Sequence, residues 1–165
     1  MPLLAPTPQS PAAPAITPKP TTNADGLWIE VARDFDALES HRAAWDDLAR
    51  NALEPNPFME AFLFLPSVKF QANTKKDIVY LFVYRANAAA NGSPQLCGFF
   101  PLRRQRTFKG LPIPSVQLWE HDHCFLATPL VRRDHARQTW RAFLDWLATA
   151  PPRPPPVEVP LPPPG

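Results

Sequence analysis

The chain has 165 residues and a formal net charge of +2, from 17 basic and 15 acidic side chains. This near balance excludes a global field that would draw the chain to nucleic acid or to an anionic membrane. Proline is unusually frequent, with 24 residues, and concentrates at both ends. Three parts are therefore predicted: a disordered proline-rich leader over residues 1–24, one globular α/β domain over residues 25–149, and a proline-rich tail over residues 150–165.

The globular part is predicted to begin with a strand and a helix. GLWIEVA at residues 26–32 alternates in the manner of a strand. Asp34 or Asp36 can then cap a long amphipathic helix that exposes His41. The apolar face of this helix is formed by Leu38, Trp45, Leu48 and Ala52.

A second helix and a run of strands are predicted next. The second helix begins after Pro57, and Pro66 is expected to end it. DIVYLFVYRAN at residues 77–87 predicts a strand buried on both faces, paired as a hairpin with QLCGFFPLRRQRTF at residues 95–108.

Short strands and a closing helix complete the predicted domain. SVQLW and CFLATPLV are the expected short strands, and Asp134 is expected to cap the final helix. The buried side of that helix is predicted to carry Trp140, Phe143, Leu144 and Leu147. This order predicts an α/β fold, with α+β as the alternative, in which helices flank a mixed sheet.

The stretch WEHDHCFLATPL at residues 119–130 concentrates reactive side chains. In an extended chain His121 and His123 share one face, whereas Asp122 lies on the other, so neither face offers the three or four ligands of a zinc site. A polar loop above a strand and a substrate-facing edge of a cleft are the remaining interpretations. His121 and His123 are thus candidate catalytic residues, Asp122 is a candidate substrate-binding residue, and no metal is expected.

A basic cluster, RRQR at residues 103–106, precedes Lys109. Its interpretations are a solvated strand end and a contact with phosphate, and Arg103 and Arg104 are candidate substrate-binding residues. No GxSxG, GxGxxG or Walker motif is present, and the five glycines stand too far apart to surround a phosphate. The chain alone is therefore not expected to bind a nucleotide or coenzyme A.

Several of these segments, taken in order, resemble the N-terminal half of the CelD/BcsL-type acetyltransferases, GNAT-fold proteins linked to cellulose or exopolysaccharide biosynthesis. They are Trp45 with Leu48, NPFMEAFLF at 56–64, LFVYR at 81–85, GFFPLRR at 98–104 and HDHCFLATPLV at 121–131. The resemblance implies acetyl transfer from acetyl-CoA to an amine or hydroxyl. It also implies that a second GNAT half holds acetyl-CoA through a glycine-bearing loop at a helix N-terminus.

Because this chain has no such loop, it is expected to be an N-terminal portion that is inactive alone and whose partner is a C-terminal GNAT half. The final helix runs directly into PPRPPPVEVPLPPPG, where a further strand would be expected, so the GNAT-like sheet is predicted to be incomplete through truncation or a frame shift. Apolar surface left exposed by a missing half would favour self-association.

The alternative function is a small non-catalytic interaction module whose polyproline segments bind partners. A cytoplasmic location is predicted in either case. Cys97 and Cys124 lie in apolar contexts typical of reduced thiols, the N-terminus does not resemble a secretory signal, and no apolar run is long enough to span a membrane.

Overall fold

The computed structural model describes residues 23, 25–70, 77–86, 93–109, 111–119 and 124–149. Apart from Asn23, the predicted leader and tail lie outside these residues. The elements follow in the order β1 (Leu27–Ala32), α1 (Phe35–Ser40), α2 (Arg42–Arg50), a 3-10 turn (Pro57–Met59), α3 (Ala61–Phe70), β2 (Ile78–Arg85), β3 (Gln95–Gln105), β4 (Ser115–Leu118), β5 (Leu130–Val131), a 3-10 turn (Arg133–His135) and α4 (Ala136–Thr149).

The described strands form a five-stranded sheet in the order β1-β2-β3-β4, with β5 also paired to β3. The combination of helices and sheet confirms a mixed helix-and-sheet fold, which is common to the predicted α/β class and its α+β alternative. Every pairing among the described strands is antiparallel, where a mixed sheet was predicted. The helices α1–α3 leave β1 and return to β2 at the same end, since Ala32 lies opposite Tyr80. They act as one long hairpin connection and not as a crossover.

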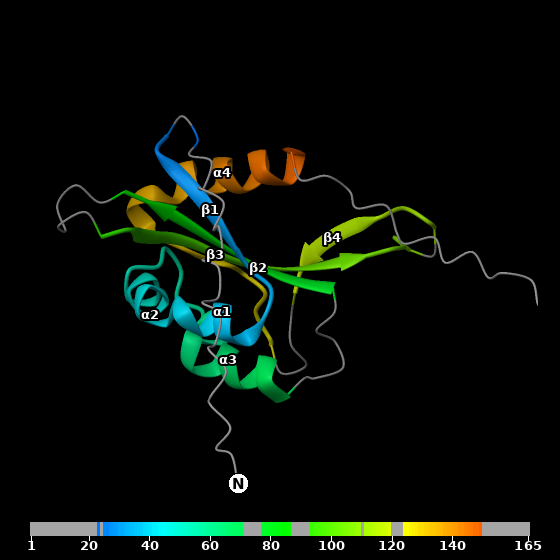
Figure 1. Ribbon diagram of the computed structural model, residues 1–165, viewed down its shortest axis with the longest axis horizontal. Helices are drawn as coiled ribbons and strands as arrows, with labels where there is room; N and C mark the ends of the chain where they lie inside the picture. The colour runs from blue at the N-terminus through cyan, green and yellow to red at the C-terminus, as the bar shows by residue number, and fades with distance from the viewer. Residues whose placement is uncertain are drawn as a thin grey trace, which may run out of the picture.

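Helices cover both faces of the sheet. Figure 1 shows α1, α2 and α3 on one side and α4 on the other. Tyr80 and Phe82 of β2 pack in the cluster beneath α1–α3, whereas Val79 and Leu81 pack in the cluster beneath α4. The prediction of a strand buried on both faces is therefore confirmed.

The larger cluster is built around Trp45 of α2, which is fully buried. Its ring centroid lies 4.1 Å from that of Phe99 and 5.4 Å from that of Phe64. Its indole Nε1 donates a hydrogen bond of 2.8 Å to the carbonyl of Met59, so the buried polar atom is satisfied.

The predicted long helix is two helices that meet at His41. Asp34 caps the first by accepting a 2.8 Å hydrogen bond from the Ala37 amide, as one of the two predicted caps. The exposed position predicted for His41 is wrong. Its ring stacks on Phe82 at 3.9 Å, and its Nδ1 lies 2.7 Å from the Tyr84 hydroxyl. The break rotates His41 toward the sheet, where aromatic contacts hold it.

The partly buried position of His41 makes the stability of the fold depend on pH. Burial lowers the pKa of His41 below its ordinary value of 6.5, although Glu30 partly opposes this. The His41 side chain therefore binds a proton more readily in the unfolded chain than in the folded one. The free energy of unfolding should fall as pH drops below about 6.5. His135 adds to this effect, because its pKa is also lowered.

We expect His41→Gln to lose less stability than the parent between about pH 7.5 and about pH 5.5, measured by urea unfolding. An equal loss in both proteins would contradict the assignment.

Two prolines occupy unexpected positions. Pro66 lies inside α3 and does not end it, because the carbonyl that loses its donor belongs to the exposed Phe62 and can bind water. Pro101 lies within the inner strand β3, where only an edge, a bulge or a strand end was expected. Its carbonyl accepts a 2.8 Å hydrogen bond from Trp119, just past the end of β4. The Pro101 nitrogen, which has no N–H, therefore lies on the side of β3 where β4 has ended and β5 has not begun. No backbone hydrogen bond of a regular strand pair is lost there.

The buried face of α4 also differs from the prediction. Phe143 is buried as expected, but Trp140 and Leu144 are exposed, while Thr139 and Ala142 face the sheet. The small side chains allow α4 to approach β3 at Gly98. A Cβ atom added to Gly98 would lie 2.5 Å from Thr139 Cγ2, which is closer than van der Waals contact permits. Close approach, and not hydrophobicity alone, decides which residues of α4 are buried.

Candidate functional site

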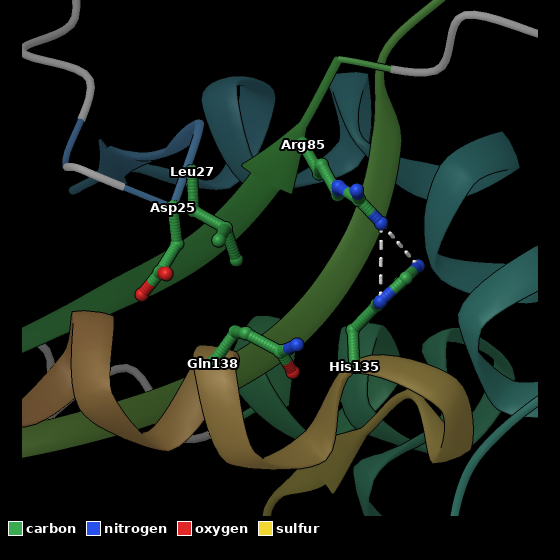
Figure 2. Close-up of a pocket in the computed structure, with 5 residues that line it drawn as sticks. All are labelled: Asp25, Leu27, Arg85, His135 and Gln138. Carbon is green, nitrogen blue, oxygen red and sulfur yellow. Dashed lines mark hydrogen bonds between the residues drawn. The ribbon is translucent and has the colours of Figure 1, made fainter.

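A polar pocket of about 190 Å³ lies where the start of β1, the end of β2 and the beginning of α4 meet. Figure 2 shows the five residues that line it: Asp25, Leu27, Arg85, His135 and Gln138. The sheet register brings two of them together, because Leu27 of β1 is the partner of Arg85 of β2. The other contributors come from the turn before β1, from the 3-10 turn Arg133–His135 and from the first turn of α4.

Arg85 is the central cation of this pocket. The side chains of Val79, Leu81 and Val83 alternate toward α4, and Arg85 continues that row beyond the apolar cluster. Its Nη1 lies 2.9 Å from His135 Nε2 and 3.2 Å from His135 Nδ1. Among the described residues no carboxylate forms an ion pair with Arg85. Its remaining N–H donors can therefore serve a ligand.

His135 is the neutral partner of this guanidinium. Burial lowers its pKa, and the neighbouring Arg85 and Arg132 lower it further, while Asp134 acts in the opposite direction. A neutral imidazole has one nitrogen without a proton, and that nitrogen can accept the hydrogen bond from Arg85. In Figure 2, Arg85 reaches down to His135, and Gln138 rises from α4 into the same space. The pocket thus offers donors from Arg85 and Gln138 and an acceptor from Asp25.

The connection between β5 and α4 contains a buried arginine with a structural role. Arg132 is buried, and its Nε donates a hydrogen bond of 2.9 Å to the Leu96 carbonyl. Its guanidinium also pairs with the carboxylate of Asp47 on α2. The connection contains no glycine, so it has neither the free backbone approach nor the space that a pyrophosphate would need. These residues do not fit coenzyme A.

The buried Cys97 thiol is poorly suited to act as a nucleophile. Burial raises the pKa of the Cys97 thiol to about 11, although Arg132 and Arg85 partly offset this. The thiol is therefore protonated at neutral pH, and a thiol is a much weaker nucleophile than a thiolate.

Of the predicted site residues, the structure describes Arg103 and Arg104. His121, Asp122 and His123 lie outside the described residues. Arg103 and Arg104 lie near the end of β3, opposite Gln117 and Val116 of β4. The pocket lies at the other end of the sheet, where Arg85 pairs with Gln95. In the described ranges no group of three or more potential ligand side chains could hold a metal ion.

Sequence reasoning missed the pocket residues for a physical reason. Arg85 could have been noticed as a charge that ends an apolar strand on the face shared with Leu81 and Val83. Nothing local in the sequence places the turn at Asp25 beside the first turn of a helix more than a hundred residues later. That proximity depends on the sheet order and on the face to which α4 returns.

Comparisons with protein-family models, with curated proteins and with solved structures found no match to this chain. Within the part of the chain that the structure describes, no helix has both the length and the apolar character needed to cross a membrane. The pocket, the fold and the order of the sequence motifs are thus the features that bear on function.

Proposed function

We propose that this chain is the acceptor-binding portion of a GNAT-type N-acyltransferase, which uses acetyl-CoA held by a second unit. The order of the segments that resemble CelD/BcsL-type proteins supports the family. A sheet with helices on both faces is compatible with it. The observation that carries the proposal is the polar pocket, which combines an arginine without a carboxylate partner among the described residues, an amide and a carboxylate.

The chemistry of the pocket suits an acceptor that carries both hydroxyl groups and an amine. Arg85 and Gln138 can donate to hydroxyl or carbonyl oxygens, and Asp25 can accept from an ammonium group. At about 190 Å³, the pocket is smaller than the sites of drug-sized ligands. A single amino-sugar ring is the acceptor that we propose, in agreement with the polysaccharide link that the resemblance implies.

The acyl-transfer chemistry itself is assigned to the second unit. A general base must take up a proton, yet the guanidinium of Arg85 next to His135 opposes formation of the imidazolium. Cys97 is protonated, and the β5–α4 connection is filled by Arg132. In this proposal the described residues orient the acceptor, and the acetyl-CoA loop and the base lie elsewhere.

Ligand binding to the isolated chain tests the proposal. We expect calorimetry and amide NMR shifts at Gln138 to report binding of glucosamine, and we expect no binding of acetyl-CoA. Arg85→Met should weaken glucosamine binding about tenfold, because a charged hydrogen bond contributes about 1.5 kcal/mol or more. Arg42→Met removes an exposed arginine of α2 and should leave binding unchanged.

Micromolar binding of acetyl-CoA by this chain alone would overturn the assignment of the cofactor to another unit. Absence of binding for glucosamine and related amino sugars would remove the acceptor role. The alternative of a non-catalytic interaction module would then be favoured. Its proline-rich segments lie outside the described residues.

A further inference from the structure

The last residues of β3, the following turn and β4 form a projecting arm over residues 103–118. Figure 1 shows this arm extending beyond the helical layers at the end of the sheet where β4 lies. Arg103 pairs with Gln117 and Gln105 with Ser115. Nearer the tip, Phe108 and Leu111 exchange backbone hydrogen bonds of 3.0 and 2.9 Å. The arm is thus a hydrogen-bonded hairpin that presents its tip to the surroundings.

Large exposed apolar side chains are concentrated in the outer part of this arm and in β4. The exposed fractions are 48% for Phe108, 56% for Leu111, 51% for Ile113 and 47% for Val116. Single exposed apolar residues are ordinary on a protein surface, but four within nine residues of one hairpin are a local concentration of apolar side chains. Burying such side chains in an apolar environment is favourable by about 1 kcal/mol or more each.

The same arm carries a concentrated positive charge. Arg103, Arg104, Arg106 and Lys109 belong to it, and the sequence contains no acidic residue between Asp77 and Glu120. Among the described residues none of these four cations forms an ion pair with a carboxylate. Lys109 lies 5.5 Å from the centre of the Phe108 ring, so cation and apolar surface are adjacent. The arm is strongly basic although the whole chain is nearly neutral.

We propose that this arm docks on the surface of an anionic phospholipid membrane. Exposed apolar side chains and cations lie next to each other along the arm, since Lys109 lies beside Phe108 at the turn and Val116 is the strand partner of Arg104. A membrane interface offers acyl chains to the apolar side chains and phosphate groups to the cations.

A nucleic acid would contact the cations but would leave the four apolar side chains in water. The binding pocket at Arg85 lies at the opposite end of β2 and β3, so the docked arm leaves that pocket open.

Sedimentation of the full chain with vesicles tests the proposal. Vesicles of phosphatidylcholine alone are compared with vesicles in which about a third of the lipid is phosphatidylglycerol. We expect at least about tenfold tighter binding to the anionic vesicles, and a clear weakening when the salt concentration is raised. Equal binding to both vesicle types, or none to either, would overturn the proposal. Binding to an acidic protein or to RNA in the absence of vesicle binding would overturn it as well.

Matched variants separate the arm from general charge and hydrophobicity. Arg106→Glu with Lys109→Glu should weaken binding to anionic vesicles at least about tenfold, because each basic residue contributes roughly a fivefold factor. Arg137→Glu with Arg141→Glu changes the net charge equally on exposed positions of α4 and should have little effect.

Phe108→Ser should weaken binding several-fold, whereas Phe62→Ser alters a phenylalanine that is 55% exposed on α3 and should not. Circular dichroism should show unchanged folding in all variants, because the substituted side chains are exposed. Similar losses in the arm variants and in the controls would refute a docking role for the arm.

Discussion

Replacing Asn56 by aspartate is expected to lower the free energy of unfolding at neutral pH by about 3 kcal/mol or more. Asn56 is fully buried. Its Nδ2 donates hydrogen bonds of 2.9 Å to the Leu126 carbonyl and 2.6 Å to the Thr128 carbonyl, and its Oδ1 accepts one of 3.1 Å from the Phe58 amide. Aspartate keeps the shape but replaces the double donor by a carboxylate that faces two carbonyl oxygens.

The pH dependence of this variant identifies the cause. A carboxyl group in this position should have a pKa raised by burial and by the two carbonyls, and its protonated form can again donate one hydrogen bond. The loss relative to the parent should therefore shrink as the pH is lowered toward about 5, measured by urea unfolding.

Gln117→Glu makes the same change from amide to carboxylate at an exposed position of β4. It serves as the control and should change stability by no more than about 0.5 kcal/mol, because the new carboxylate stays in water. A loss for Asn56→Asp that does not vary with pH would argue against the assigned hydrogen bonds.

Gly98→Ala is expected to destabilise the domain by about 2–3 kcal/mol through overpacking between β3 and α4. The new methyl group would lie 2.5 Å from Thr139 Cγ2 and 2.7 Å from Phe100 Cε2. The Phe100 ring cannot move freely, because it stacks on Phe143 at 4.2 Å. Either α4 must shift away from the sheet, or the rings must leave their packed positions.

A double-mutant cycle with Thr139→Ser tests this close approach. Serine removes Cγ2 but keeps the hydroxyl, which in Thr139 donates a 2.8 Å hydrogen bond to the His135 carbonyl. In the Thr139→Ser background Gly98→Ala should therefore cost less, with a coupling of about 1 kcal/mol. Strictly additive losses in thermal or urea unfolding would show that α4 is not held against Gly98.

The parts of the fold that could be predicted from the sequence are those in which local pattern and tertiary burial agree. Trp45 and Leu48 lie at helical spacing and are buried, and the apolar run of β2 is covered on both faces. The predicted hairpin of β2 and β3 is confirmed for the same reason.

The errors arise where tertiary contacts override local spacing. His41 turns inward because Phe82 and Tyr84 offer aromatic contacts that no local pattern reveals. Trp140 and Leu144 remain exposed because α4 approaches the sheet closely at Gly98, where only small residues of the helix fit. Hydrophobic periodicity predicts that a helix has a buried side, but the shape of the sheet below it decides which side that is.

The pocket could be predicted least of all. Its polar lining comes from the start, the middle and the end of the folded domain, and each side chain alone looks like an ordinary surface residue. Only the antiparallel pairing of β1 with β2 and the return of α4 across them bring Arg85, His135 and Gln138 together.

The burial of β2 on both faces has a consequence for how the domain comes apart. Phe82 belongs to one apolar cluster and Leu81 to the other, although the two residues are adjacent in the chain. Detaching α4 would expose the apolar side chains on one face of this strand to water, and detaching α1–α3 would expose those on the other face. The loss of either helical layer therefore destabilises the sheet against which the other layer packs. Thermal melting of the described domain should be one cooperative event.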